Sequence, residues 1–160
     1  MPALPSASEP REVCPAVLVP LAPGELIDKI TILEIKQCRI ADPHKLDHVC
    51  RELALLRSAR DQGVPLCQEL TQLTARLHAV NASLWQIEDD IRLCERAGDF
   101  GSRFIALARS VYLCNDERAA LKQQINALLQ APFQEQKSYP AYATRALPPA
   151  SFLGVETSTR

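Results

Sequence analysis

The sequence has almost no net charge and no long run of apolar residues. Its 18 Lys and Arg residues are balanced by 19 Asp and Glu residues, which gives a formal net charge of −1. No overall field therefore attracts nucleic acid or an anionic membrane, so a charged ligand has to be bound locally. The apolar runs are far shorter than the ~20 residues of a membrane-crossing helix. We expect neither nucleic-acid binding nor membrane insertion.

The standard signatures of catalysis are also missing. The sequence contains no Gly-rich phosphate loop, no GxSxG elbow and no HExxH motif. Its six cysteines form no CxxC pair, and the first 20 residues lack the pattern of a secretory signal. We therefore expect reduced cysteines in a cytoplasmic protein with no cofactor and no metal. Zinc binding by scattered Cys and His residues is the weaker alternative.

The two ends of the chain are rich in Pro, Ser and Ala and have no apolar period. We expect residues 1–13 and 143–160 to be flexible extensions and residues 14–142 to form a single helical domain. Val17 to Leu21 is a short, partly β-branched run, which predicts either one extended strand or an arm packed on the helices. A lone strand needs an edge to pair with, such as the same strand of a second subunit.

Helix-start and helix-stop signals predict two helices in the first half of the domain. The first begins at Pro23 and ends near Ala41, and its apolar residues cover more than one face. We therefore place it at the centre of the core. The second follows the N-cap Asp42 and ends at Gly63.

The second half of the domain contains the most regular pattern in the sequence. Apolar residues recur in heptads from Leu66 to Cys94 and again from Phe104 to Leu128, with Gly98 ending the first of these two helices. A short connection favours an antiparallel hairpin that pairs the two helices about residue 99. That register predicts three contacts, namely Cys94 with Phe104, Ile87 with Val111, and Leu73 with Ile125. The expected fold is an all-α, four-helix antiparallel bundle.

Arg118 interrupts the apolar heptad of the last helix, where the register places it beside Asn81. An arginine at such a position needs a carboxylate partner or an anionic ligand unless its stem carries the charge to solvent. Asn115 and Lys122 lie three residues before and four after it on one helix surface. The three residues predict a phosphate or carboxylate site, with a solvated basic edge as the alternative.

A second polar stripe runs beside the heptad of the preceding helix and contains Trp85, Glu88 and Arg92. The hairpin register brings Glu88 towards Arg109 and Tyr112. These three are our candidate catalytic residues, because a carboxylate between an arginine and a phenol is suited to acid or base catalysis. The alternative is a structural ion pair. Trp85 is suited to a core, a dimer surface or a ligand platform.

Carboxylates near this stripe suggest a magnesium site as an alternative. Glu88, Asp89 and Asp90 follow one another, and further carboxylates from the first helix could converge on them. Arg92 and Lys29 compete as ion-pair partners, so ordinary helix-surface pairing is the simpler interpretation.

Three ordered motifs resemble an uncharacterised bacterial family of short proteins that is catalogued as a domain of unknown function. They are PGELIDKITILEIK at 23–36, LWQIEDDIR at 84–92, and RFIALARSVY at 103–112 with Asn115-Asp116 and the closing Lys137-Ser138-Tyr139. The likeness covers about residues 17–142. Members are often encoded among genes for cell-surface polysaccharides, which implies a glycan-related role. Ala22 departs from the usual serine-like N-cap, at a cost of about 1 kcal/mol.

These observations lead to two functional hypotheses. The first is a non-catalytic helical binding or accessory protein that serves a glycan-assembly enzyme, either as a monomer or as a homodimer. The second is a small all-α enzyme whose pocket lies between the first, third and fourth helices. It holds an anionic molecule through Arg109, Arg118 and Lys122, with Glu88 as acid or base. The two hypotheses together give seven candidate binding residues: Asp28, Lys29, Trp85, Arg92, Asn115, Arg118 and Lys122.

Overall fold

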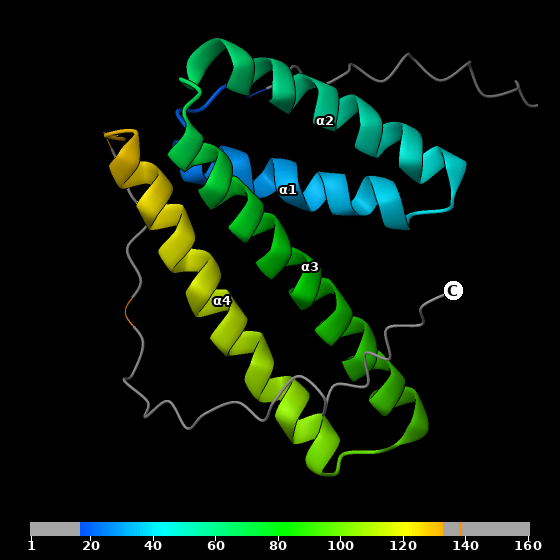
Figure 1. Ribbon diagram of the computed structural model, residues 1–160. Helices are drawn as coiled ribbons and strands as arrows, with labels where there is room; N and C mark the ends of the chain where they lie inside the picture. Colours follow the sequence, from blue (N-terminus) through cyan, green and yellow to red (C-terminus); the bar gives the residue numbers. More distant parts are fainter. Residues whose placement is uncertain (1–16, 133–137, 139–160) are drawn as a thin grey trace, which may run out of the picture.

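The computed structural model describes residues 17–132 and Ser138. Within these residues the chain forms four α-helices and no strand (Figure 1). The predicted all-α fold is therefore confirmed. The predicted flexible extensions, 1–13 and 143–160, lie outside the described residues.

The helix boundaries follow from local chemistry. α1 spans Pro23–Arg39, α2 spans Pro43–Gly63, α3 spans Gln68–Ala97 and α4 spans Ser102–Leu128. Asp42 caps α2 by accepting hydrogen bonds from the backbone N–H groups of the next turn. Gly98 ends α3 in the left-handed conformation, with φ of 65°. The start of α3 was predicted too early, because Leu66 precedes the helix and is 79% exposed.

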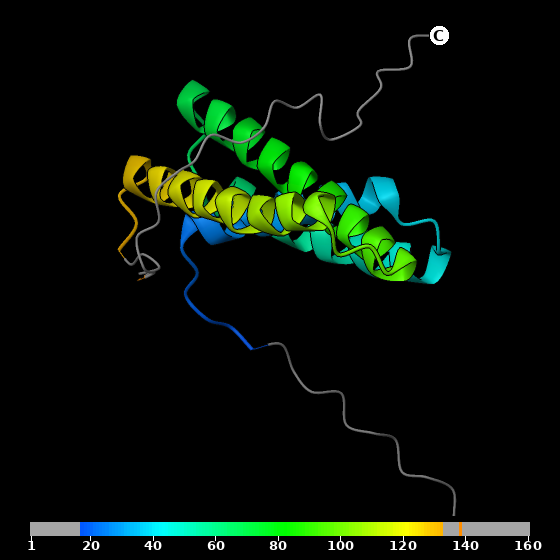
Figure 2. The ribbon, with the colours of Figure 1, turned by 90° about the horizontal axis from the view of Figure 1, so that it is seen from below.

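α1 lies at the centre of the helix arrangement. It contacts each of the other helices, whereas α2 contacts only α1 among the helices described. α3 and α4 form a long antiparallel hairpin, and α1 and α2 lie across one end of it (Figures 1 and 2). The opposite end of the hairpin, where α3 turns into α4, projects beyond α1 and α2. The predicted central position of the first helix is confirmed.

The hairpin register agrees with the heptad pairing. Leu73 and Ile125 belong to one apolar cluster, which also contains Ile27 of α1. A second cluster near the α3–α4 turn brings the other predicted pairs together, Ile87 with Val111 and Cys94 with Phe104. Regular spacing on two helices joined by a short turn is therefore sufficient to set this register.

The segment before α1 does not behave as predicted. Val17 to Leu21 forms no strand with any described residue, and the side chains of its first three residues do not pack on the helices. Val17 is 81% exposed and Leu18 is 94% exposed. The predicted strand is therefore wrong, because the described residues contain no strand with which it could pair. The packed arm is wrong for Val17, Leu18 and Val19, whereas Leu21 is half covered. Figure 2 shows the segment leading away from the helices.

Candidate functional site

A cavity of about 390 Å³ lies where α1, α3 and α4 meet. Each helix presents one face to it, because the lining residues on each helix recur every three or four positions, with two adjacent pairs on α3, 84–85 and 88–89. The lining is mixed, with one aromatic ring, two amides, apolar side chains and charged groups. It consists of Ile32 and Lys36 from α1, Asn81, Leu84, Trp85, Glu88, Asp89 and Arg92 from α3, and Asn115 and Arg118 from α4.

A buried carboxylate holds the cavity's arginine in place. Asp28 of α1 is 3% exposed, and it accepts two hydrogen bonds from Arg118. Arg118 Nε lies 2.8 Å from Asp28 Oδ1, and Nη2 lies 2.5 Å from Oδ2. This bidentate geometry fixes the plane of the guanidinium as well as its distance.

Two further side chains complete the hydrogen bonding around Asp28. Asn81 of α3 donates to Asp28 Oδ1 at 2.8 Å and to the hydroxyl of Thr31 at 2.9 Å. Thr31 in turn donates to the backbone carbonyl of Asp28. Among the described residues, no buried side-chain N or O atom lacks a hydrogen-bond partner. This network of Asp28, Thr31, Asn81 and Arg118, which we call the Asp28 network, therefore joins three helices behind the cavity.

Exposed ion pairs form the outer part of the cavity. Arg92 lies 3.0 Å from Glu88 and 3.6 Å from Asp89, and all three residues are on α3. More than half of the Arg92 and Glu88 side chains is exposed. Pairs of this kind contribute little to stability, so these side chains are able to exchange partners with a ligand at small cost.

The structure brings together five of the residues singled out from the sequence. Trp85, Glu88, Arg92, Asn115 and Arg118 all line the cavity. Asp28 was also named as a binding residue, and it lies behind Arg118. It supplies the carboxylate partner that an arginine in an apolar seam needs. The requirement for such a partner followed from the sequence, whereas its identity came from the structure.

Four other residues singled out from the sequence lie elsewhere. Lys29 pairs with Glu52 of α2, and Lys122 pairs with Glu25 of α1 at 2.6 Å. Arg109 donates to Tyr112 at 3.4 Å, and neither residue lines the cavity.

The expected triad of Glu88, Arg109 and Tyr112 therefore needs correction. Glu88 forms its ion pair with Arg92, four residues along its own helix, instead of across the hairpin. The expected cationic set is corrected too, because Arg109 and Lys122 do not accompany Arg118 in the cavity. Of the residues named in the second functional hypothesis, an enzyme, Glu88 and Arg118 line the cavity, and the hypothesis itself stays a prediction.

The carboxylates considered for magnesium pair with basic side chains. Glu34 contacts Arg57 at 2.7 Å, and Asp90 contacts Arg103 at 3.7 Å. Within residues 17–132, no group of three or more His, Cys, Asp or Glu side chains could hold one metal ion. The described helices also include none that is long and apolar enough to cross a membrane.

Sequence reasoning did not single out the residues that α1 contributes to the cavity, Ile32 and Lys36. Ile32 and Lys36 follow Asp28 at intervals of four residues, so all three lie along one face of the helix. This four-residue spacing could have indicated that these residues share one face of α1. It was overlooked because Ile32 belongs to a helix that is apolar on several faces.

Comparison with known proteins supports one assignment. A family model described as a family of unknown function, DUF6165, matches residues 17–158. The chain belongs to this family. No curated protein and no solved structure matches the chain.

The DUF6165 match includes every residue that lines the cavity and every member of the Asp28 network. Because the description of DUF6165 names no activity, the chemistry of the site has to be derived from its own side chains. Trp85 offers an aromatic surface, Asn81 and Asn115 carry amides, and Glu88 and Asp89 carry hydrogen-bond acceptors. Such a set is able to orient a small polar molecule that has many hydroxyl groups.

Proposed function

We propose that this protein is a non-catalytic binding protein that holds a sugar, either neutral or carrying one carboxylate, in the cavity between α1, α3 and α4. The observation that carries the proposal is the lining itself, in which Trp85 lies among amide, carboxylate and guanidinium groups. An aromatic side chain provides apolar contact for a ring, and the surrounding polar groups provide directional hydrogen bonds.

The charge balance favours a ligand of low charge. Three cationic side chains and two carboxylates line the cavity, and the buried Asp28 neutralises Arg118 from behind. A multiply charged phosphate needs an excess of cations or a helix N-terminus to replace its hydration. With Asp28 counted, three cations face three carboxylates, and the lining includes no helix N-terminus. Hydroxyl groups and at most one carboxylate therefore fit the site better.

The state of Glu88 supports binding in preference to catalysis. Its side chain is 53% exposed and paired with Arg92. A general acid or base is usually desolvated, or placed beside a group that shifts its pKa towards neutrality. The resemblance of the motifs to a family encoded among polysaccharide genes supports a ligand from cell-surface glycan assembly. In that setting we propose that the protein presents a sugar to, or retains it for, a glycan-assembly enzyme.

Trp85 provides a direct test, because it is the only tryptophan in the chain and it lines the cavity. Its fluorescence is measured while the full chain is titrated with D-glucuronate, D-glucose or inorganic phosphate. We expect saturable changes with one or both sugars and a weaker response to phosphate. Absence of saturation with both sugars, or tighter binding of phosphate, would overturn the proposal.

A pair of amide variants on α4 localises the binding. Asn115→Ala removes an amide from the cavity, whereas Gln124→Ala removes one from the exposed surface of the same helix. We expect Asn115→Ala to weaken sugar binding roughly 2- to 10-fold, the range for one neutral hydrogen bond. Gln124→Ala should leave affinity unchanged. Equal affinity of the two variants would show that the sugar binds elsewhere.

A further inference from the structure

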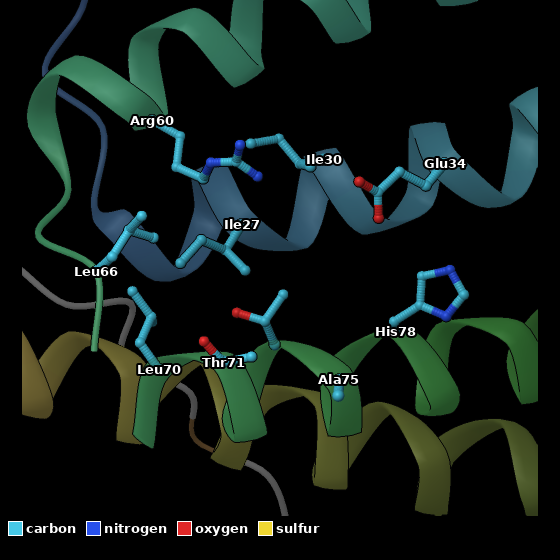
Figure 3. Close-up of a pocket in the computed structure, with 10 residues that line it drawn as sticks. Ile27, Ile30, Glu34, Arg60, Leu66, Leu70, Thr71, Ala75 and His78 are labelled. Carbon is cyan, nitrogen blue, oxygen red and sulfur yellow. The ribbon is translucent and has the colours of Figure 1, made fainter. Parts of the chain in front are cut away.

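A second cavity, of about 370 Å³, lies between α1 and α3 (Figure 3). Side chains from α1 and α3 point into it, and Arg60 of α2 lies at one end. Most of its lining is apolar or of small side chains, in contrast to the sugar cavity. We call it the α1–α3 groove, and its lining residues are Ile27, Ile30, Glu34, Arg60, Leu66, Leu70, Thr71, Thr74, Ala75 and His78.

The same molecule has an apolar segment without an apolar surface to cover it. Val17 is 81% exposed, Leu18 is 94%, Val19 is 69% and Leu21 is 50%. We call residues 17–21 the arm. In an extended chain successive side chains point to opposite sides, so this arm is apolar on both sides. Such a segment is typical of a strand that is enclosed on two faces.

The arm and the groove match in length. Five extended residues span about 17 Å at 3.3 Å per residue. The groove runs along α3 for about 12 Å, from Leu70 to His78 at 1.5 Å per residue, and continues to Leu66 before the helix. One arm would therefore occupy the groove from end to end.

The arm is held away from the groove of its own chain. Val19 and Ala22 each precede a proline, which disfavours the helical conformations that a tight turn requires. Ala22 is extended, with φ of −66° and ψ of 141°. Because the groove runs along α1 in the direction of the helix, the arm would have to reverse its direction at these residues to enter it.

We infer that the arm of one molecule binds in the α1–α3 groove of a second copy, and that the exchange is reciprocal. A two-fold axis closes the assembly as a dimer, because each chain offers one arm and one groove. This inference concerns a different surface from the sugar cavity and does not depend on the proposed function.

The area that this exchange would bury approaches that of a stable dimer. Each buried Val or Leu side chain removes roughly 60–120 Å² of apolar surface from water. Two or three such side chains share one side of each arm, and on two arms, with the matching groove surfaces, they give roughly 500–1,400 Å². Stable interfaces bury about 1,200–2,000 Å² in total.

The mass of the full chain in solution, measured by sedimentation over a wide range of concentrations, tests the inference. We expect a dimer for the unaltered chain. Leu18→Asp in the arm and Ala75→Glu in the groove should each weaken dimerisation at least about tenfold, because a carboxylate would be buried without a partner. Both positions are exposed in the single chain, so neither change should disturb its fold.

Matched controls place the same substitutions outside the arm and the groove. Leu55→Asp alters an exposed leucine of α2, and Ala79→Glu alters an exposed alanine one turn beyond Ala75 on α3. Neither residue lines the groove, so both variants should dimerise normally. A monomeric unaltered chain, or a dimer that is insensitive to Ala75→Glu, would overturn the inference.

Mixing the two defective chains separates this arrangement from simple pairing of two arms. The Leu18→Asp chain retains a usable groove, and the Ala75→Glu chain retains a usable arm. Their mixture should form a heterodimer through one intact contact, although each variant alone is mainly monomeric. Failure of the mixture to associate would contradict the exchange of arms.

Discussion

Asp28 is the residue on which three helices converge. It is carried by α1, accepts a bidentate pair of hydrogen bonds from Arg118 of α4, and accepts another from Asn81 of α3. A buried carboxylate without partners would be costly, and so would an arginine in an apolar seam. Their pairing offsets both costs and sets the orientation of the guanidinium in the cavity between α1, α3 and α4.

Asp28→Asn should therefore be strongly destabilising. The substitution preserves volume but leaves the partly buried Arg118 charge without its counter-ion, so we expect the free energy of unfolding to fall by about 2–4 kcal/mol. Urea denaturation measures the change. Glu88→Gln is the matched control, because it breaks an exposed pair and should cost less than about 1 kcal/mol. Similar losses for both variants would contradict a structural role for the Asp28 network.

The cysteines should differ in their reactivity towards iodoacetamide. Burial raises the pKa of the Cys114 thiol, and the neighbouring Glu117 carboxylate raises it further. Because the thiolate is the reactive form, Cys114 should react at least about tenfold more slowly at pH 8 than the exposed Cys38 and Cys67. Its rate should increase only as the pH rises beyond the ordinary thiol pKa of about 8.5.

Mass spectrometry of the modified peptides measures these rates. In urea the burial is lost, so the rates of the three cysteines should become similar. A fast reaction of Cys114 in the folded protein would mean that the contact between α3 and α4 opens readily.

At the scale of the element, the first turn of α1 is completed by α4. Ala22 gives no side-chain cap, in agreement with the lost cap expected from the sequence. Asn126 of α4 instead accepts a hydrogen bond from the backbone N–H of Gly24 at 2.7 Å. Lys122, one turn away, pairs with Glu25. A tertiary contact thus replaces the local cap, and it requires the two helices to approach closely.

Gly24→Ala tests this close approach. An added Cβ would lie 2.6 Å from the backbone oxygen of Lys122 and 2.9 Å from Asn126 Oδ1. We expect the separation of α1 and α4 to lower the free energy of unfolding by about 1–3 kcal/mol. Gly63→Ala is the control, because no atom lies within 4 Å of its added Cβ. It should be neutral or stabilising by up to about 1 kcal/mol in the same denaturation experiment.

At the scale of the whole molecule, the helices are unequally attached. α1 contacts three helices, whereas α2 contacts only α1 among those described. The residues that α2 buries are Val49 and Leu53, while α3 and α4 share a long apolar seam. Regions with few buried apolar contacts open at lower free energy than the rest of a protein.

Native-state hydrogen exchange should therefore show α2 opening before the α3–α4 hairpin. We expect the most protected amides of α2 to exchange at least about tenfold faster than those at the centre of α3, a difference of about 1.4 kcal/mol. Peptide-level mass spectrometry resolves the two helices. Equal protection would indicate that the molecule opens only as a single cooperative unit.

The amino-acid sequence by itself determined the number of helices, their boundaries to within a few residues, and the pairing of α3 with α4. These features depend on local spacing, caps and one short connection, all of which are readable along the chain. It also indicated that Arg118 needed an anionic partner, because a charge in an apolar seam is costly wherever the partner lies.

Only the tertiary structure decided which groups meet. Asp28 and Arg118 are 90 residues apart, so their contact depends on how α1 lies across the hairpin, which local periodicity does not specify. The same placement of α1 turned Lys122 towards Glu25 and created the cavity between α1, α3 and α4. Helical spacing places side chains on a face of one helix, but the packing of several helices determines what that face contacts.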